Sequence, residues 1–158
     1  SVILKKPIKG LMDSKKLSSK KREDLSQIII ENSVFAIGAA DSHEIDQINI
    51  LQASLLAMQR SLEKLDMQPK KVLVDGNHIF ETSTEIEAIV GGDNLIPSIS
   101  AASIVAKVFR DRLMMAYSKE FPNYGFDKHK GYPTKLHKEM LKKYGLTRIH
   151  RRTFKGVN

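Results

Sequence analysis

The order of apolar and polar residues along the chain predicts strands that alternate with helices. Four short apolar runs, rich in β-branched residues and followed by turn-forming ones, are predicted as strands: 2–4, 34–39, 71–75 and 86–90. Four longer segments carry apolar residues at helical spacing: 19–29, 41–65, 97–115 and 135–144. This alternation favours an α/β fold with a largely parallel sheet.

The predicted helices also carry start signals. Ser18 and Thr134 are placed to cap two of them, and Asp41 with Glu44 has the spacing of a capping box. One apolar stripe predicts a single long amphipathic helix: Leu51, Leu55, Met58, Leu62 and Leu65. A second set is expected on one face of a later helix: Ala101, Ile104, Val105, Val108, Phe109 and Met115.

The charge of the chain is concentrated at its C-terminal end. The 158 residues are enough for one domain with a core, and their net charge is +8. The first 127 residues are nearly neutral, with 16 basic and 17 acidic side chains, whereas the last 31 hold ten basic residues and one acidic residue. Such a segment favours a polyanionic partner, usually nucleic acid, and a solvated basic tail is the alternative.

Composition and missing motifs exclude several classes of protein. Hydrophobic residues make up 41% of the chain and charged residues 28%, a profile that fits neither a disordered chain nor a membrane protein. The chain has no cysteine, so thiolate metal sites and cysteine nucleophiles are excluded. It also lacks the glycine-rich phosphate-binding loops of NTPases and dehydrogenases and the serine motif of hydrolases.

Two aspartates are the strongest candidates for chemistry. Asp75 and Asp93 each follow a predicted strand and border glycines. Ligands of parallel sheets gather beyond the carboxyl ends of the strands, so neighbouring strands would bring both carboxylates to one edge. Oxygen donors suit Mg²⁺ or Mn²⁺, which can activate water for phosphodiester hydrolysis. Taken singly, each aspartate is explained better by an ordinary turn than by a metal site.

Other candidate residues are more ambiguous. His43, Glu44 and Asp46 resemble a ligand set, but they fall in the first turn of a helix, where capping and dipole effects favour acids. Lys130 and Tyr132 lie in a glycine-proline loop within the basic segment. The aromatic ring could stack on a base or sugar and the lysine could bind phosphate, and a simple turn explains the loop as well.

Several separated motifs resemble bacterial ribonuclease HII in the same order. They are DSKKLS at 13–18, HEIDQINI at 43–50, VDGN at 74–77, GD at 92–93, ISAASIVAKV at 99–108, HKGYPT at 129–134 and HRRTF at 150–154. The resemblance implies an RNase H-like α/β fold with a mixed central sheet flanked by helices and a basic C-terminal helical segment. It divides the chain into a nuclease core at 1–120 and a substrate-binding segment at 121–158.

The resemblance implies a metal-dependent endonuclease that cuts the RNA strand of RNA–DNA hybrids. It also implies incision 5′ to a single ribonucleotide in duplex DNA, with Mn²⁺ or Mg²⁺ as cofactor and a role in ribonucleotide excision repair. We expect a cytoplasmic monomer with no membrane partner. The alternative is a nucleic-acid-binding module without catalytic activity.

The resemblance assigns roles to individual residues. Asp75 and Asp93 fall on the third and fourth of the family's four active-site carboxylates, which makes them the expected catalytic residues and metal ligands. Tyr132 falls on the tyrosine that senses the ribose 2′-hydroxyl, the group that distinguishes RNA from DNA. The residues expected to contact phosphates are Lys128, Lys130, Arg151 and Arg152.

One departure from the family concerns the beginning of the chain. Family members start with a strand that carries an Asp-Glu pair followed by Gly-Arg-Gly, and the present sequence starts at Ser1 without it. From the sequence we therefore expect a chain that lacks two of the four carboxylates and is inactive by itself.

Overall fold

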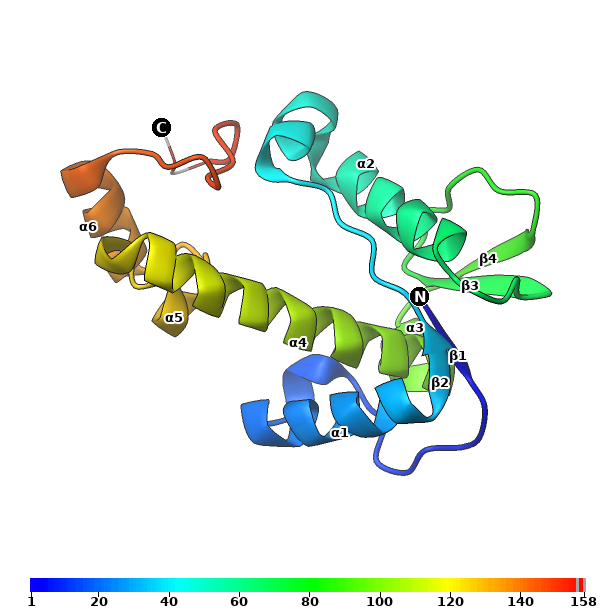
Figure 1. Cartoon of the computed structure of the whole chain (residues 1–158). Coiled ribbons are helices and arrows are strands. Elements are labelled where there is room, and N and C mark those ends of the chain that lie inside the picture. The colour runs from blue at the N-terminus through cyan, green and yellow to red at the C-terminus, as the bar shows by residue number, and fades with distance from the viewer. Residues whose placement is uncertain (156, 158) are drawn as a thin grey trace. The chain divides into compact units, whose positions relative to one another are not determined.

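The computed structural model describes residues 1–155 and 157 (Figure 1). The chain forms two compact units, each built from two segments of the sequence. The first unit contains Ser1–Ala39 and Ser54–Val108, and the second contains Ala40–Ala53 and Phe109–Asn158. The expected division at residue 120 separates functions, and it stays a prediction.

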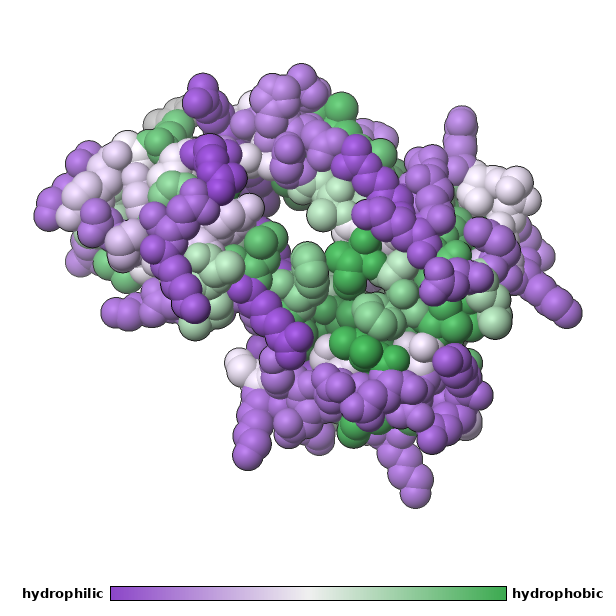
Figure 2. Space-filling model, viewed as in Figure 1, coloured by the Kyte–Doolittle hydropathy of each residue, from purple (hydrophilic) through white to green (hydrophobic). Residues whose placement is uncertain are grey.

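The first unit begins with a β-α-β arrangement whose strands are antiparallel. Strand β1 (Val2–Leu4) pairs with β2 (Ser33–Phe35), and α1 (Ser19–Glu31) connects them after the short 3-10 helix η1 (Ser14–Lys16). The hydroxyl of Ser18 caps α1 by accepting the N–H of Lys21 at 3.3 Å, as the sequence predicts. Hydrophilic residues cover α1 on the face seen in Figure 2.

Strand β2 is shorter than the expected run of 34–39. Ala36 N–H still donates to Ser1 O at 3.1 Å, and the chain then leaves the ladder. Two residues later, Gly38 packs against a helix so closely that an added Cβ would lie 2.0 Å from the carbonyl oxygen of Ala57. Contact with this helix therefore replaces strand pairing after Phe35.

A second sheet holds the two parallel strands. Strand β3 (Lys71–Asp75) pairs with β4 (Glu85–Ile89), close to the expected 71–75 and 86–90. The ammonium of Lys71 bridges Glu85 and Glu87 on β4 at 2.8 and 2.7 Å, which supports this register. Parallel and antiparallel pairs are both present, as expected for a mixed α/β architecture, and they form two separate two-stranded sheets within the described residues.

The long helix α2 (Ser42–Glu63) is interrupted, which corrects the prediction of one continuous helix. Asn49 has φ 67° and ψ 168°, a conformation far from helical. Its side-chain oxygen accepts the N–H groups of Leu51 and Gln52 at 3.0 and 3.2 Å, so it caps the second helical segment. Leu51, the first member of the predicted stripe, is exposed beside this kink.

Helix α4 (Pro97–Glu120) follows the short α3 (Gly92–Leu95) and contributes to the cores of both units. Its early residues Ala101, Ile104 and Val105 share one buried face, as predicted, and this face packs with the buried residues of α1. The prediction was wrong further along the helix, because Phe109 and Met115 are both 45% exposed. Beyond Val108 the helix packs against a different core and turns another side of its surface toward it.

The core of the second unit is aromatic. Met114 of α4 is buried with Tyr124, at the end of η2 (Pro122–Tyr124), and Phe126, the first residue of α5 (Phe126–His129). The rings of Tyr124 and Phe126 stack with centroids 5.5 Å apart. Helix α6 (Lys135–Tyr144) covers them, and Thr134 caps it through the N–H of His137, as predicted. None of the described helices is both long enough and apolar enough to span a membrane.

Candidate functional site

Asp75 is exposed at the carboxyl end of β3. Its register partner is Ile89, the last residue of β4, and the N–H of Gly76 extends the ladder by donating to Ile89 O at 3.0 Å. Gly76 has φ 109°, which L side chains rarely adopt. The glycine therefore allows the chain to turn away directly after the carboxylate.

Asp93 reaches the same edge of the sheet from the neighbouring strand. It follows Ile89 by four residues, after a turn at Gly91 with φ 68°, and lies in α3, which packs against β3. Asp93 is buried, and its backbone carbonyl accepts the hydroxyl of Ser100. Because β3 and β4 are adjacent and parallel, Asp75 and Asp93 both follow the carboxyl ends of neighbouring strands.

A chain of hydrogen bonds leads from a lysine to Asp93. The ammonium of Lys16 donates to Asn94 Oδ1 at 2.8 Å, and Asn94 Nδ2 donates to Asp93 Oδ1 at 2.9 Å. The side-chain amide of Asn94 is oriented by both partners, because the ammonium of Lys16 can only donate and the carboxylate of Asp93 accepts. Lys16 lies in the sequence motif at 13–18, but no local signal connects it with Asp93, because 77 residues separate them.

The donor set at this edge suits a hard divalent cation. Both candidate ligands are carboxylates, and Mg²⁺ commonly binds through one or two carboxylates while keeping several water ligands. In the part of the chain that the structure describes, no group of three or more His, Asp or Glu side chains forms a metal site. By the usual coordination of Mg²⁺, an ion held by two carboxylates keeps water ligands that phosphate oxygens can replace.

The second unit carries the predicted substrate-binding residues. Tyr132 lies between Gly131 and Pro133 in the loop before α6, and its side chain is 62% exposed. Gly131 has φ 84°, and a Cβ there would lie 3.4 Å from Nη2 of Arg110. Arg110 of α4 therefore lies beside this loop.

The four predicted phosphate-binding residues differ in their surroundings. Lys128 and Arg152 are exposed. Lys130 folds back, since its ammonium donates to Asp127 O and contacts the sulfur of Met115 at 2.9 Å. The guanidinium of Arg151 lies 3.6 Å from the centroid of the Phe154 ring. Burial and the nearby Arg110 lower the pKa of Arg151, whereas Asp46 raises it.

The acids near the start of α2 divide into two roles. Glu44 and Asp41 form the predicted capping box: Asp41 N–H donates to Glu44 at 2.9 Å and Glu44 N–H to Asp41 at 2.8 Å. Asp46 instead accepts three hydrogen bonds from the C-terminal segment. These are the N–H of Arg152 at 2.8 Å and the N–H and hydroxyl of Thr153 at 2.9 and 2.7 Å.

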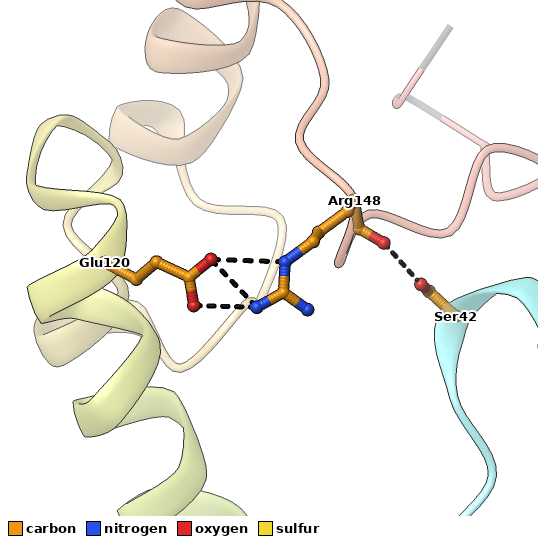
Figure 3. A network of polar contacts seen from close by, with 3 residues as sticks. All are labelled: Ser42, Glu120 and Arg148. Atoms are coloured by element: carbon orange, nitrogen blue, oxygen red, sulfur yellow. Dashed lines mark hydrogen bonds and ion pairs between the residues drawn. The ribbon is translucent and has the colours of Figure 1, made fainter.

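Arg148 provides a second attachment of the C-terminal segment (Figure 3). Its guanidinium binds both carboxylate oxygens of Glu120 at 2.8 Å, and its backbone carbonyl accepts the hydroxyl of Ser42 at 2.8 Å. Bidentate pairs of this kind fix direction as well as distance. Ser42 and Asp46 hold residues 148–153 against the first segment of the second unit, and Glu120 attaches Arg148 to the end of α4.

Comparison with known proteins identifies the family. Residues 3–157 match the ribonuclease HII family over nearly the whole chain. The chain belongs to the ribonuclease HII family. It is 53% identical over 151 residues to ribonuclease HII of Coxiella burnetii, covering 95% of this chain and 75% of that protein. It is 55% identical over 152 residues to ribonuclease HII of Shewanella piezotolerans, covering 96% and 75%.

Solved structures confirm the fold of this ribonuclease HII family chain. The ribonuclease H2 of Pyrococcus horikoshii OT3 superposes with a TM-score of 0.77 at 25% identity, covering 94% of this chain and 78% of that one. The ribonuclease HII of Archaeoglobus fulgidus, in its complex with PCNA, gives a TM-score of 0.72 at 23% identity. It covers 92% of this chain and 79% of that chain, and shows the fold alone.

The ribonuclease HII family consists of endoribonucleases of the ribonuclease H type, and the chain has the family's RNase H-like α/β fold. The roles of the individual residues stay predictions.

Proposed function

We propose that the chain is a divalent-metal-dependent endonuclease that hydrolyses the RNA strand of RNA–DNA hybrids and incises 5′ to a single ribonucleotide in duplex DNA. The observation that carries this proposal is the placement of Asp75 and Asp93 beyond the ends of two paired parallel strands. Mg²⁺ or Mn²⁺ is the ion that fits two carboxylates. When bound, it would activate water and stabilise charge on the leaving oxygen.

The protein residues then act around the scissile phosphate. Asp75 and Asp93 hold the ion, and the Lys16–Asn94 pair keeps the carboxylate of Asp93 oriented. Tyr132, exposed in its loop, stacks on the ribonucleotide and detects its 2′-hydroxyl. Lys128, Lys130, Arg151 and Arg152 contact phosphates, so that residues 121–158 form the substrate-binding segment.

The biological setting follows from the substrate. A nuclease that nicks beside a single ribonucleotide starts its removal from DNA, so the proposed role is ribonucleotide excision repair, and the proposed location is the cytoplasm. We propose that it acts as a monomer.

Cleavage of a defined duplex tests the proposal. The substrate is an end-labelled DNA duplex with one ribonucleotide. It is incubated with Mn²⁺ or Mg²⁺ and the full-length protein, because we expect this chain by itself to be inactive, and affinity is measured separately without metal. We expect a single cut 5′ to the ribonucleotide, loss of at least about 100-fold in cleavage rate for Asp75→Asn and Asp93→Asn, and unchanged affinity. Asp66→Asn, an exposed aspartate elsewhere in the first unit, is the matched control and should cleave normally.

Two outcomes would contradict the proposal. Binding of the duplex without cleavage in either metal would favour a non-catalytic nucleic-acid-binding module. Cleavage that survives Asp75→Asn would place the metal elsewhere.

A further inference from the structure

Three buried histidines form a stack beneath the loop that carries Tyr132. His129, His137 and His150 are each at most 7% exposed, and they come from α5, α6 and the C-terminal segment. The rings of His129 and His137 are stacked with centroids 4.4 Å apart, and His150 lies 5.4 Å from His137. The proposed reaction assigns none of them a role.

Backbone groups determine where His129 carries its proton. Its Nε2 lies 2.7 Å from the carbonyl oxygen of Tyr124, which can only accept, so Nε2 is the donor. Its Nδ1 accepts the N–H of Gly131 at 3.1 Å and is therefore unprotonated. Both ring nitrogens of His129 are thus engaged, one of them by the residue before Tyr132.

The same reasoning fixes the other two rings. Nδ1 of His137 lies 3.0 Å from the carbonyl oxygen of Tyr132 and must donate to it. If His137 is neutral, its Nε2 accepts from Nε2–H of His150 at 3.1 Å. Nδ1 of His150 accepts the N–H of Thr147 at 2.9 Å, so His150 carries its proton on Nε2 as the arrangement requires.

The stack accommodates three neutral rings and no extra proton. Protonating any one of them would place a donor against a donor, at Gly131, at the contact between His137 and His150, or at Thr147. Burial lowers the pKa of His137, and it lowers that of His150 to about 4. The charged or titratable groups that face His137 are His129, His150 and Arg151, and the edge-to-face ring of Phe126 adds apolar surface.

The loop is held from both sides of Tyr132. The N–H of Tyr132 donates to His129 O at 2.9 Å, and its carbonyl accepts the N–H of Thr134 at 2.8 Å in addition to His137. The backbone of Tyr132 is therefore tied down while the ring is exposed. An aromatic ring that must meet one nucleotide gains from such preorganisation, because less orientation is lost on binding.

We propose that His137 is a positioning residue: with His129 and His150, it fixes the backbone of Tyr132 so that the ring meets the ribonucleotide in one orientation. The inference rests on the proposed function, in which Tyr132 contacts the substrate.

A double-mutant cycle tests this role. His137→Leu removes the donor to Tyr132, and we expect kcat/KM for the single-ribonucleotide duplex to fall about tenfold. In a Tyr132→Ala background the same substitution should change kcat/KM less than about twofold, because its effect passes through the ring. His137→Asn, whose amide nitrogen can replace Nδ1 as donor, should recover most of the activity.

The outcomes separate this inference from the proposed function. If Tyr132→Ala cleaves normally, the proposed role of Tyr132 fails. If Tyr132→Ala is impaired but His137→Leu is silent or additive with it, the positioning role fails. Histidine ¹⁵N spectra of the unmodified protein test the stack independently of any variant: we expect the proton on Nδ1 of His137 and on Nε2 of His129 and His150, and a different pattern overturns the proposal.

Discussion

The side chain of Asp46 binds the backbone of a segment that lies 106 residues away in the sequence. Its carboxylate accepts from Arg152 and twice from Thr153, and these bonds, led by the N–H of Thr153, lower its pKa from the ordinary 3.8. Because the folded pKa is the lower one, this contribution to stability is present above the unfolded pKa and is lost as the pH falls through the folded one.

Replacing Asp46 with Asn should weaken the proposed binding of nucleic acid, although it removes a negative charge from a protein whose proposed partner is a polyanion. The backbone N–H groups of Arg152 and Thr153 lose their charged acceptor, so we expect their hydrogens to exchange with solvent about tenfold faster. We also expect the affinity of the protein for a duplex to fall severalfold. Asp127→Asn changes the charge equally in the same unit and should bind as well as the parent or slightly better. Equal affinities for both variants would mean that Asp46 does not organise the basic segment.

Local sequence signals made the two aspartates candidates, a role that stays a prediction, but they did not indicate the histidine stack. Asp75 and Asp93 could be recognised because each follows an apolar run and borders glycines, which are local signals. His137 and His150 are partners only because α6 and the C-terminal segment fold onto the same aromatic core. The residues next to each histidine in the sequence give no signal of this contact. Asp46 was misassigned for the same reason, since a position near a helix start does not reveal a partner at Thr153.

At the level of elements, the packing of Gly38 against α2 leaves no room for a side chain. A Cβ at this position would lie 2.0 Å from the carbonyl oxygen of Ala57 and 2.6 Å from the amide nitrogen of Ser61, both backbone atoms of the helix. Neither can move without shifting α2.

Gly38→Ala should therefore destabilise the protein by about 3 kcal/mol, the upper end of the usual cost of overpacking. Urea denaturation measures the loss. Gly92→Ala serves for comparison, because its Cβ would meet Ile99 Cδ1 at 2.6 Å, the end of a side chain that can rotate away. A cost for Gly38→Ala no larger than that for Gly92→Ala would show that the backbone of α2 adjusts easily.

The elements themselves were largely predictable where their signals are local. Ser18, Thr134 and the Asp41–Glu44 pair mark helix starts because a cap depends on three or four neighbouring residues. The kink at Asn49 was not predictable from the apolar stripe, because the spacing of apolar residues indicates which side is buried and not whether the helical backbone is continuous. The change of buried face along α4 depends on which core each half meets.

For the whole molecule, the buried histidines predict a loss of stability in mild acid. The ordinary pKa of 6.5 applies to the unfolded chain, whereas His150 titrates at about 4 when folded. Between these values the unfolded chain binds a proton that the folded chain excludes. The free energy of unfolding therefore falls as the pH drops from 6.5 to 4, and the contribution of His150 is fully present above pH 6.5. The loss for His150 is about 3 kcal/mol.

Urea unfolding at pH 7.5, 5.5 and 4 measures this dependence. In His150→Gln, whose amide nitrogen can still donate to His137, we expect the fall between pH 6.5 and 4 to be smaller by about the amount assigned to His150. His43→Gln, at an exposed position, is the matched control variant. An identical dependence in His150→Gln would show that other groups cause it.

The attachment of residues 148–153 to the beginning of α2 also has a consequence for the order of folding. Ser42 meets Arg148, and Asp46 meets Arg152 and Thr153, across sequence separations of 106 and 107 residues. Closing a loop of that length costs conformational entropy before its contacts form, and contacts of high sequence separation slow folding. During synthesis, residues 40–53 can therefore form these contacts only after residues 148–153 have been made. The surface proposed to bind nucleic acid is thus completed last.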